Sequence, residues 1–133
     1  MMEQKSFSVK KMIKSFGFAI NGLRILIREE HNARIHLFVA GVVIIASIGF
    51  GISAFEWTVV ILAIGFVLGA EIFNTAIESM ADFISPEKDE RIKKIKDLSA
   101  AGVLISAVTA FAIGLFVFLP KFWIVMNGLL PKL

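Results

Sequence analysis

The sequence predicts an all-α integral membrane protein with an N-terminal amphipathic surface helix and three transmembrane helices. The apolar share of 57% exceeds the roughly 45–50% of soluble domains, and the mean hydropathy is +0.82. Residues 37–55 and 98–120 are uncharged over 19 and 23 positions, and each reaches the roughly 20 residues that a spanning helix needs. A third apolar stretch, 57–84, is interrupted by acids. Without a linker-like segment, we expect one domain over residues 1–133.

The first element is a predicted interfacial helix over about residues 5–30. At 100° per residue one face of this helix collects polar side chains, while apolar residues occupy the rest of its circumference. The polar face contains Lys10, Lys14, Asn21, Arg24 and Arg28. Such a helix lies on the membrane surface, where its basic face is either an ordinary anchor that reaches towards lipid headgroups or part of a functional site.

The three spans are predicted at about 35–55, 57–84 and 96–120. The first connection is short and centred on Glu56, so the first two spans should form a tight hairpin with Trp57 at the membrane interface. The second connection is the long polar segment "SPEKDERIKKIKD", where Pro86 is a natural helix stop.

The distribution of basic residues predicts the topology. Lys and Arg number seven in residues 1–36 and five in 85–97, against none in the first loop and two after Pro120. The positive-inside rule therefore places the N-terminus and the 85–97 loop in the cytoplasm. Because the basic residues flank apolar spans, we expect no nucleic-acid partner.

Small residues at four-residue spacing predict close helix packing and an oligomer. Gly65 and Gly69 form one such pair, and Ser106, Ala110 and Gly114 form a second series. The chain has no cysteine, which excludes disulfides and thiolate metal sites.

The stretch "GAEIFNTAIESMAD" keeps three carboxylates inside the second span. On a helical wheel Glu71, Asn74, Glu78 and Asp82 fall on one stripe. If the hydrocarbon begins near Trp57, Glu71 lies about 21 Å and Glu78 about 31 Å along the helix, against a hydrocarbon thickness of roughly 30 Å. The stripe therefore crosses the cytoplasmic boundary of the membrane.

An acid at the centre of a spanning helix costs roughly 2.5–3.5 kcal/mol, so we interpret this stripe as a functional site. Two carboxylates around an amide could hold Mg²⁺, and a carboxylate partly withdrawn from water could abstract a proton. The mixed charges of 85–97 could receive a polyphosphate, although such a run is more often a solvated cytoplasmic face. His31 and His36 are five residues apart, which is poor spacing for shared metal ligation.

Two other classes of protein would also keep acids or small residues in a span. A proton-coupled transporter subunit should distribute polar residues through all its spans, whereas the first and third spans contain only serines and one threonine. A non-enzymatic membrane assembly subunit would explain the small residues but not why the span keeps the acidic stripe despite its free-energy cost.

Four segments resemble the prokaryotic diacylglycerol kinase family, which consists of small three-span membrane enzymes. They are "EIFNTAIESMAD" (71–82), "IKSFGFAINGLR" (13–24), "REEHNARIH" (28–36) and "KDLSAAGVLI" (96–105), and they occur in the order and spacing of that family. The chain also lacks the nucleotide loop G-x-x-x-x-G-K-S/T, as this family does.

The resemblance implies a homotrimeric, Mg²⁺-dependent kinase with active sites between subunits. The enzyme would transfer the γ-phosphate of ATP to the hydroxyl of diacylglycerol or undecaprenol and so form phosphatidic acid or undecaprenyl phosphate. It would act in phospholipid or lipid-carrier metabolism, as a multi-pass protein of the bacterial cell membrane.

The resemblance also implies roles for particular residues. Glu71 corresponds to the catalytic base and Asn74 to an active-site amide, while Glu30 and Glu78 correspond to carboxylates that bind the metal. Positions implied to contact the nucleotide are Lys11, Phe18, Glu30, Glu78, Glu87, Lys88, Asp89, Lys96 and Asp97. Positions implied to contact the lipid are Glu71, Arg34 and Ala100.

Three positions depart from the common pattern of the family. Phe18 stands where a tyrosine is common, which removes a hydroxyl contact to the nucleotide. Lys11 replaces an arginine of some members and exchanges a bidentate fork for a point charge. The segment with Asn32, Arg34 and His36 looks more like the undecaprenol-kinase branch, since the diacylglycerol branch tends to carry an acid at the position of His36. The identity of the lipid is left open.

Overall fold

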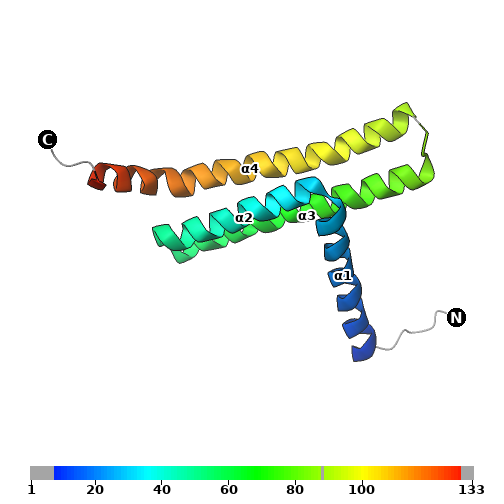
Figure 1. Cartoon of the computed structure of the whole chain (residues 1–133), viewed down its shortest axis with the longest axis horizontal. Helices are drawn as coiled ribbons and strands as arrows, with labels where there is room; N and C mark the ends of the chain where they lie inside the picture. The colour runs from blue at the N-terminus through cyan, green and yellow to red at the C-terminus, as the bar shows by residue number, and fades with distance from the viewer. Residues whose placement is uncertain (1–7, 88, 130–133) are drawn as a thin grey trace.

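The computed structural model describes residues 8–87 and 89–129, and these residues form four helices. They are α1 (Val9–Glu29), α2 (His31–Phe50), α3 (Ala54–Ile84) and α4 (Glu90–Leu129). Figure 1 shows α3 and α4 running side by side with α2 against α3, while α1 leaves this bundle at a steep angle. The last three helices are each long and apolar enough to cross a membrane. The prediction of an all-helical chain with three such helices is confirmed.

A seven-residue spacing governs how α2 and α3 pack. The buried residues of this series are Ala33, Ala40 and Ser47 on α2, and Val60, Val67 and Ala81 on α3. Side chains seven apart stay on one side of a helix that supercoils gently around its neighbours. Asn74 occupies the position between Val67 and Ala81 in the same register. We call this line of α3, from Val60 to Ala81, the α3 seam.

The apolar core lies at the end of the bundle where α2 turns into α3. Ile52, Val60 and Val117 are buried there, and one residue comes from the turn, one from α3 and one from α4. The rings of Phe50 and Phe118 lie 6.0 Å apart, centroid to centroid, and add an aromatic contact between α2 and α4. This core holds the three helices together at the end opposite the polar 85–97 segment.

The turn between α2 and α3 has a clear local cause. Gly51 has a φ of 58°, which favours glycine, and its N–H donates to the Ile48 carbonyl while that of Ile52 donates to the Ser47 carbonyl. Ser53 then caps α3, since its Oγ accepts from the N–H of Glu56 and the Glu56 carboxylate accepts from the N–H of Ser53, at 3.3 and 2.7 Å.

The helix ends differ from the predicted span boundaries. The first connection comprises residues 51–53 and not the surroundings of Glu56, which belongs to the first turn of α3, because the glycine turn ends α2 five residues earlier than expected. Helix α4 is longer than the predicted span 96–120, since it begins at Glu90 and continues through Pro120. Just beyond this proline Lys121 Nζ lies 2.8 Å from Glu56 Oε1 and ties α4 to the start of α3.

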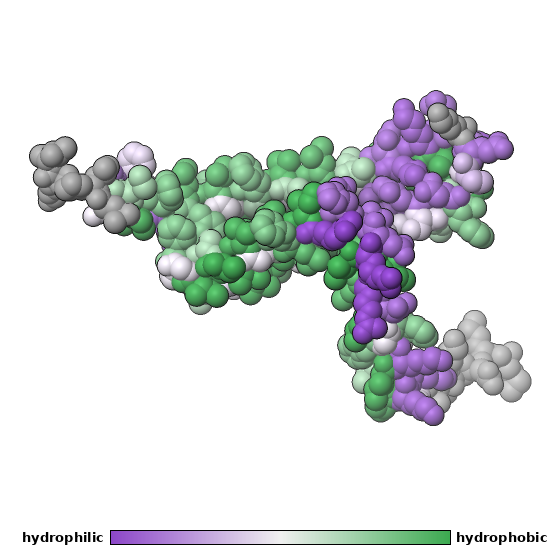
Figure 2. All heavy atoms as spheres, viewed as in Figure 1, coloured by the Kyte–Doolittle hydropathy of each residue, from purple (hydrophilic) through white to green (hydrophobic). Residues whose placement is uncertain are grey.

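The surface of the bundle is apolar. Phe38, Phe83 and Phe116 are 73%, 89% and 83% exposed, and Figure 2 shows hydrophobic residues covering the greater part of α2, α3 and α4. Hydrophilic residues gather instead at the α3–α4 turn and along α1 (Figure 2). An apolar surface of this extent is typical of contact with lipid or with other apolar protein surfaces. The chain is a membrane protein.

The glycines of the expected packing motifs have open surroundings within the chain. A Cβ atom added at Gly65, Gly69 or Gly114 would meet no atom within 4 Å among the described residues. A side chain at these positions would therefore meet no other described residue of the same chain. Their predicted role in an oligomer stays a prediction.

Replacing Ser53 with alanine should destabilise the protein by about 1 kcal/mol, since the cap of α3 loses its side-chain acceptor. Thermal unfolding in detergent measures this as a lower midpoint. Thr109→Ala is the matched control, because that hydroxyl only donates to the carbonyl of Ile105 in its own helix. Equal midpoints for Ser53→Ala and the unmodified protein would contradict the role of the cap.

Candidate active site

The polar stripe of α3 follows its packing seam and becomes more buried along it. Asp82 is exposed, Glu78 and Asn74 are half-buried, and Glu71 is only 2% exposed. Asn74 lies in the register of Val67 and Ala81, and Glu71 lies one turn after Val67. The carboxylates therefore enter the space between the helices and are not spread over the lipid-facing surface.

Glu71 faces α2. The Nε2 atom of His36 lies 3.1 Å from Glu71 Oε1, and the two side chains are 24% and 3% exposed. The ring nitrogen is close enough for an ion pair but is not aligned as a hydrogen bond, so that Oε1 is buried with no hydrogen-bond donor among the described residues. Glu30 and Glu78 are near enough for their charges to act on this carboxylate. The charges of two other acids therefore act on the buried Glu71 carboxylate.

Asn74 connects the stripe to α4. Its Nδ2 donates to Glu78 Oε1 at 3.0 Å, and the hydroxyl of Ser99 donates to its Oδ1 at 2.6 Å. No site role had been predicted for Ser99. The available signal was its place seven residues before the buried Ser106, on the side of α4 that faces α3. This serine orients the amide, and the amide in turn orients the Glu78 carboxylate.

A polar hollow lies at the α3–α4 turn, with a volume of about 540 Å³. It brings together four residues predicted to contact a nucleotide, namely Glu87, Asp89, Lys96 and Asp97. The Nζ atom of Lys96 donates to both carboxylate oxygens of Asp82, at 2.9 and 3.1 Å, across the hairpin. The hollow therefore joins the exposed end of the stripe.

Asp89 is already paired within this hollow. The Arg91 side chain donates to both of its carboxylate oxygens, and these hydrogen bonds hold the pKa of Asp89 at about 2. The carboxylate is thus ionised at neutral pH. Arg91 belongs to the 85–97 run whose mixed charges were predicted to receive a polyphosphate, although the family resemblance assigned it no role.

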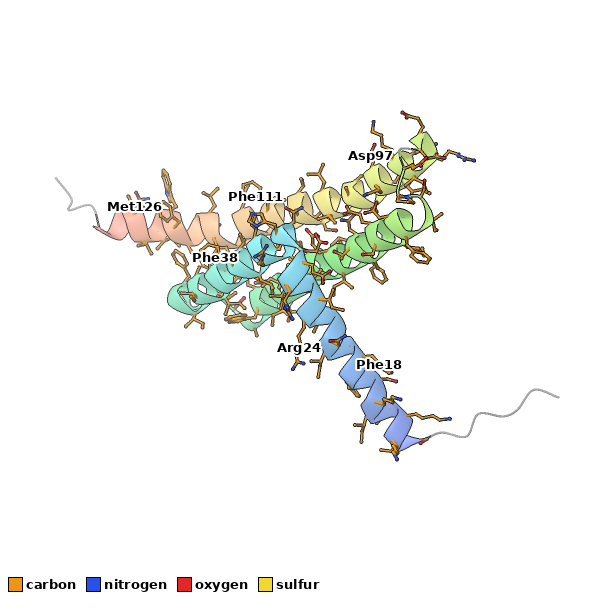
Figure 3. All side chains as sticks on the ribbon, turned by 45° about the vertical axis from the view of Figure 1, so that its right-hand side comes forward. Phe18, Arg24, Phe38, Asp97, Phe111 and Met126 are labelled. Atoms are coloured by element: carbon orange, nitrogen blue, oxygen red, sulfur yellow. The ribbon has the colours of Figure 1, made fainter. Side chains whose placement is uncertain are left out.

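The remaining predicted residues do not converge on the hollow within this chain. Lys11 and Phe18 are exposed on α1, and Figure 3 shows Phe18 on the arm that points away from the α3–α4 turn, where Asp97 lies. Lys14 Nζ stands 5.8 Å from the centre of the Phe18 ring. Arg34 on α2 and Ala100 on α4 are also exposed. Lys88 lies outside the described residues.

The two predicted metal-binding carboxylates fit Mg²⁺ chemically. Glu30 is half-buried at the single-residue break between α1 and α2, and Glu78 is held by Asn74. The described residues contain no group of three or more His, Cys, Asp and Glu side chains that could form a metal cage. Mg²⁺ commonly uses one or two carboxylates together with substrate phosphates, so a full protein cage is not required.

An apolar cavity of about 440 Å³ lies between α2, α3 and α4. Val39 and Val43 of α2, Val67 of α3 and Phe111 of α4 contribute to its wall. His36 is its one ionisable lining residue among those that the structure describes. The cavity therefore borders the ring that contacts Glu71.

Comparison with known proteins identifies the class of enzyme. The chain is 35% identical over 113 residues to an undecaprenol kinase of Bacillus subtilis, an alignment that covers 85% of this chain and 92% of the relative. A diacylglycerol kinase of Synechocystis is 32% identical over 82% of this chain and 63% of its own length. That of Escherichia coli K12 is 27% identical over 82% and 89%.

Both kinds of relative are phosphotransferases with an alcohol acceptor. Residues 17–118 match the family model of the prokaryotic diacylglycerol kinases, which is most of the chain. The chain thus belongs to the prokaryotic diacylglycerol kinase family of membrane lipid kinases.

Proposed function

We propose that the protein transfers the γ-phosphate of ATP to the hydroxyl of undecaprenol or diacylglycerol. The products are undecaprenyl phosphate or phosphatidic acid, together with ADP. The observation that carries this proposal is the series of polar side chains on one stripe of α3, from Asp82 at the hollow, through Glu78 and the Asn74 that is hydrogen-bonded to it, to the buried Glu71. A water-soluble phosphate donor and a lipid acceptor can meet along such a path.

In the proposed reaction Glu71 acts as the general base. The proton of the lipid hydroxyl passes to the Glu71 carboxylate while the hydroxyl oxygen bonds to the γ-phosphorus. The bond from that phosphorus to the bridging oxygen breaks, and ADP leaves with the electron pair. Asn74 and Ser99 keep the neighbouring carboxylate of Glu78 in place. Phosphate transfer depends mainly on such positioning and on neutralised charge.

The nucleotide is proposed to bind in the polar hollow. Lys96 supplies a positive charge there, and Glu87 and Asp97 flank it. Lys11, Phe18 and Lys88 belong to the same nucleotide set. In a homotrimer α1 of a neighbouring copy would bring Lys11 and Phe18 to this end, and the open glycines of α3 support close contact between copies.

Glu30 and Glu78 are the residues that would hold Mg²⁺. When bound, this ion would neutralise negative charge on the phosphate oxygens. The Glu30 carboxylate comes from the α1–α2 break and the Glu78 carboxylate from α3.

The proposed location is the bacterial cell membrane, with the N-terminus in the cytoplasm. Helix α2 is about 30 Å long and α3 about 46 Å, so α3 extends beyond a hydrocarbon layer of roughly 30 Å. The hydrophilic α3–α4 turn (Figure 2) is proposed to be the end that leaves the membrane. Helix α1, steeply inclined to α2 (Figure 1), would then lie along the cytoplasmic interface. The exposed Arg34 and Ala100 are proposed to contact the lipid.

Undecaprenol is the acceptor that we propose first. The basis is the segment with Asn32, Arg34 and His36, together with the 35% identity to a relative named undecaprenol kinase. A transporter subunit or an assembly subunit would leave the membership in a kinase family unexplained.

Replacing Glu71 with glutamine should abolish lipid phosphorylation, because the base is lost at almost constant volume. We expect a fall in kcat of roughly 10²–10⁴, the usual contribution of a general base, with nucleotide binding and oligomer assembly retained. Glu56→Gln, at the other end of α3, is the control and should stay active once its stability has been verified. Retention of most activity in Glu71→Gln would refute its role as base.

Replacing Glu30 or Glu78 with glutamine should raise the Mg²⁺ concentration that gives half-maximal activity by roughly tenfold, since a carboxylate ligand is lost. Activity is measured over a Mg²⁺ titration at saturating ATP and lipid. Glu29→Gln tests the neighbouring exposed acid and should leave the titration unchanged. If Glu30→Gln and Glu78→Gln had the same titration midpoint as the unmodified protein, ligation by Glu30 and Glu78 would be contradicted.

Replacing Lys96 with glutamine should raise the KM for ATP by roughly tenfold, since a charge-assisted contact to phosphate is removed. The matched control is Lys94→Gln, because Lys94 is exposed and does not line the hollow. Initial rates over a series of ATP concentrations give both values. An unchanged KM for ATP in Lys96→Gln would contradict the proposal that the nucleotide binds in the hollow.

A further inference from the structure

His36 is the residue of α2 that faces Glu71. It lies three residues after Ala33 and four before Ala40, which are 0% and 9% exposed, so all three share the side of α2 that packs on α3. Because alanines flank it, the α2 backbone can approach α3 closely on both sides of the histidine. The imidazole occupies the space between them and reaches to 3.1 Å from Glu71 Oε1.

The chemistry of this contact is asymmetric. An imidazole can donate a hydrogen bond from Nε2, whereas an ionised carboxylate can only accept. Glu71 Oε1 has no hydrogen-bond donor among the described residues, and a buried polar atom without a partner is costly. His36 Nε2 lies 3.1 Å from this atom, and catalytic contacts that are poorly aligned in a free enzyme commonly tighten when substrate binds.

We propose that His36 is a positioning residue for Glu71. Its Nε2–H donates to Glu71 Oε1 in the substrate complex, fixes the orientation of the carboxylate, and leaves Oε2 to receive the proton of the acceptor hydroxyl. The proton goes to Glu71 and not to the imidazole. This inference rests on the proposed function, since that function makes Glu71 the base.

The apolar cavity supports this arrangement. Its wall includes His36 together with apolar residues of α2, α3 and α4. The ring therefore stands between an apolar space and the carboxylate. A residue in this place can hold Glu71 at the border between the chain of a lipid and the polar path that leads to the hollow.

Two substitutions of His36 separate positioning from packing. His36→Leu removes the donor and keeps an apolar side chain, while His36→Gln keeps an amide donor at about the reach of Nε2. We expect His36→Leu to lower kcat by roughly ten- to a hundredfold, because a small misplacement of a catalytic group has effects of this size. The KM for ATP should change by less than about twofold, and His36→Gln should restore most of kcat.

The matched control is His31→Leu, since His31 is exposed in the first turn of α2 and has no assigned role. A second readout does not depend on activity. In protein labelled with ¹⁵N-histidine, Glu71→Gln should shift the imidazole resonance of His36 and leave that of His31 unchanged.

Wild-type kcat in His36→Leu would overturn the inference, as would equal losses in the leucine and glutamine variants together with a raised KM for ATP. An unchanged His36 resonance in Glu71→Gln would overturn the contact itself. These outcomes differ from failure of the proposed function, in which the unmodified protein phosphorylates no lipid. In that case His36 has no catalytic base to position, while the His36 resonance in Glu71→Gln still reports whether the two side chains interact.

Discussion

The site depends on one constraint, which is the seven-residue packing seam of α3. Val60 and Val67 fill this seam near the apolar core, and Asn74 and then Ala81 continue it towards the polar end. Because the seam faces other helices, Glu71 and Asn74 are withdrawn from lipid and meet partners on α2 and α4. The same periodicity that packs the helices thus arranges the polar groups, so changes to packing should also alter the site.

The two ends of the bundle have different tasks. At the end with the α2–α3 turn, the glycine turn, the cap of α3 and the pair of Glu56 with Lys121 fix the helices relative to one another. At the other end the contacts between α3 and α4 are polar, as in the pair of Asp82 with Lys96. The glycine turn, the helix cap, the ion pair and the apolar core therefore fix the helices at one end, and the polar site lies at the other end.

Hydropathy and helical periodicity were sufficient to predict the helical class, three long apolar helices and a single stripe of polar residues on α3. Hydropathy and periodicity could not predict the contacts between helices. A contact such as that of Ser99 with Asn74 depends on which residues of the antiparallel helices α3 and α4 lie level with each other. The turn at Gly51 and the continuation of α4 through Pro120 were likewise missed, since hydropathy does not report local turn geometry and spanning helices tolerate a proline. In the sequence His36 was considered as a poorly spaced metal ligand and as a mark of the undecaprenol-kinase branch, and only the fold reveals its contact with Glu71.

The most direct test of the account is to follow labelled phosphate. The purified protein is incubated in lipid micelles with Mg²⁺ and ATP that carries a labelled γ-phosphate. Undecaprenol and diacylglycerol are supplied in separate reactions, and the lipid products are separated by chromatography. Label is expected in undecaprenyl phosphate, in phosphatidic acid, or in both, in proportion to the ADP formed. Label that stays in ATP or appears only as free phosphate with every lipid would contradict it.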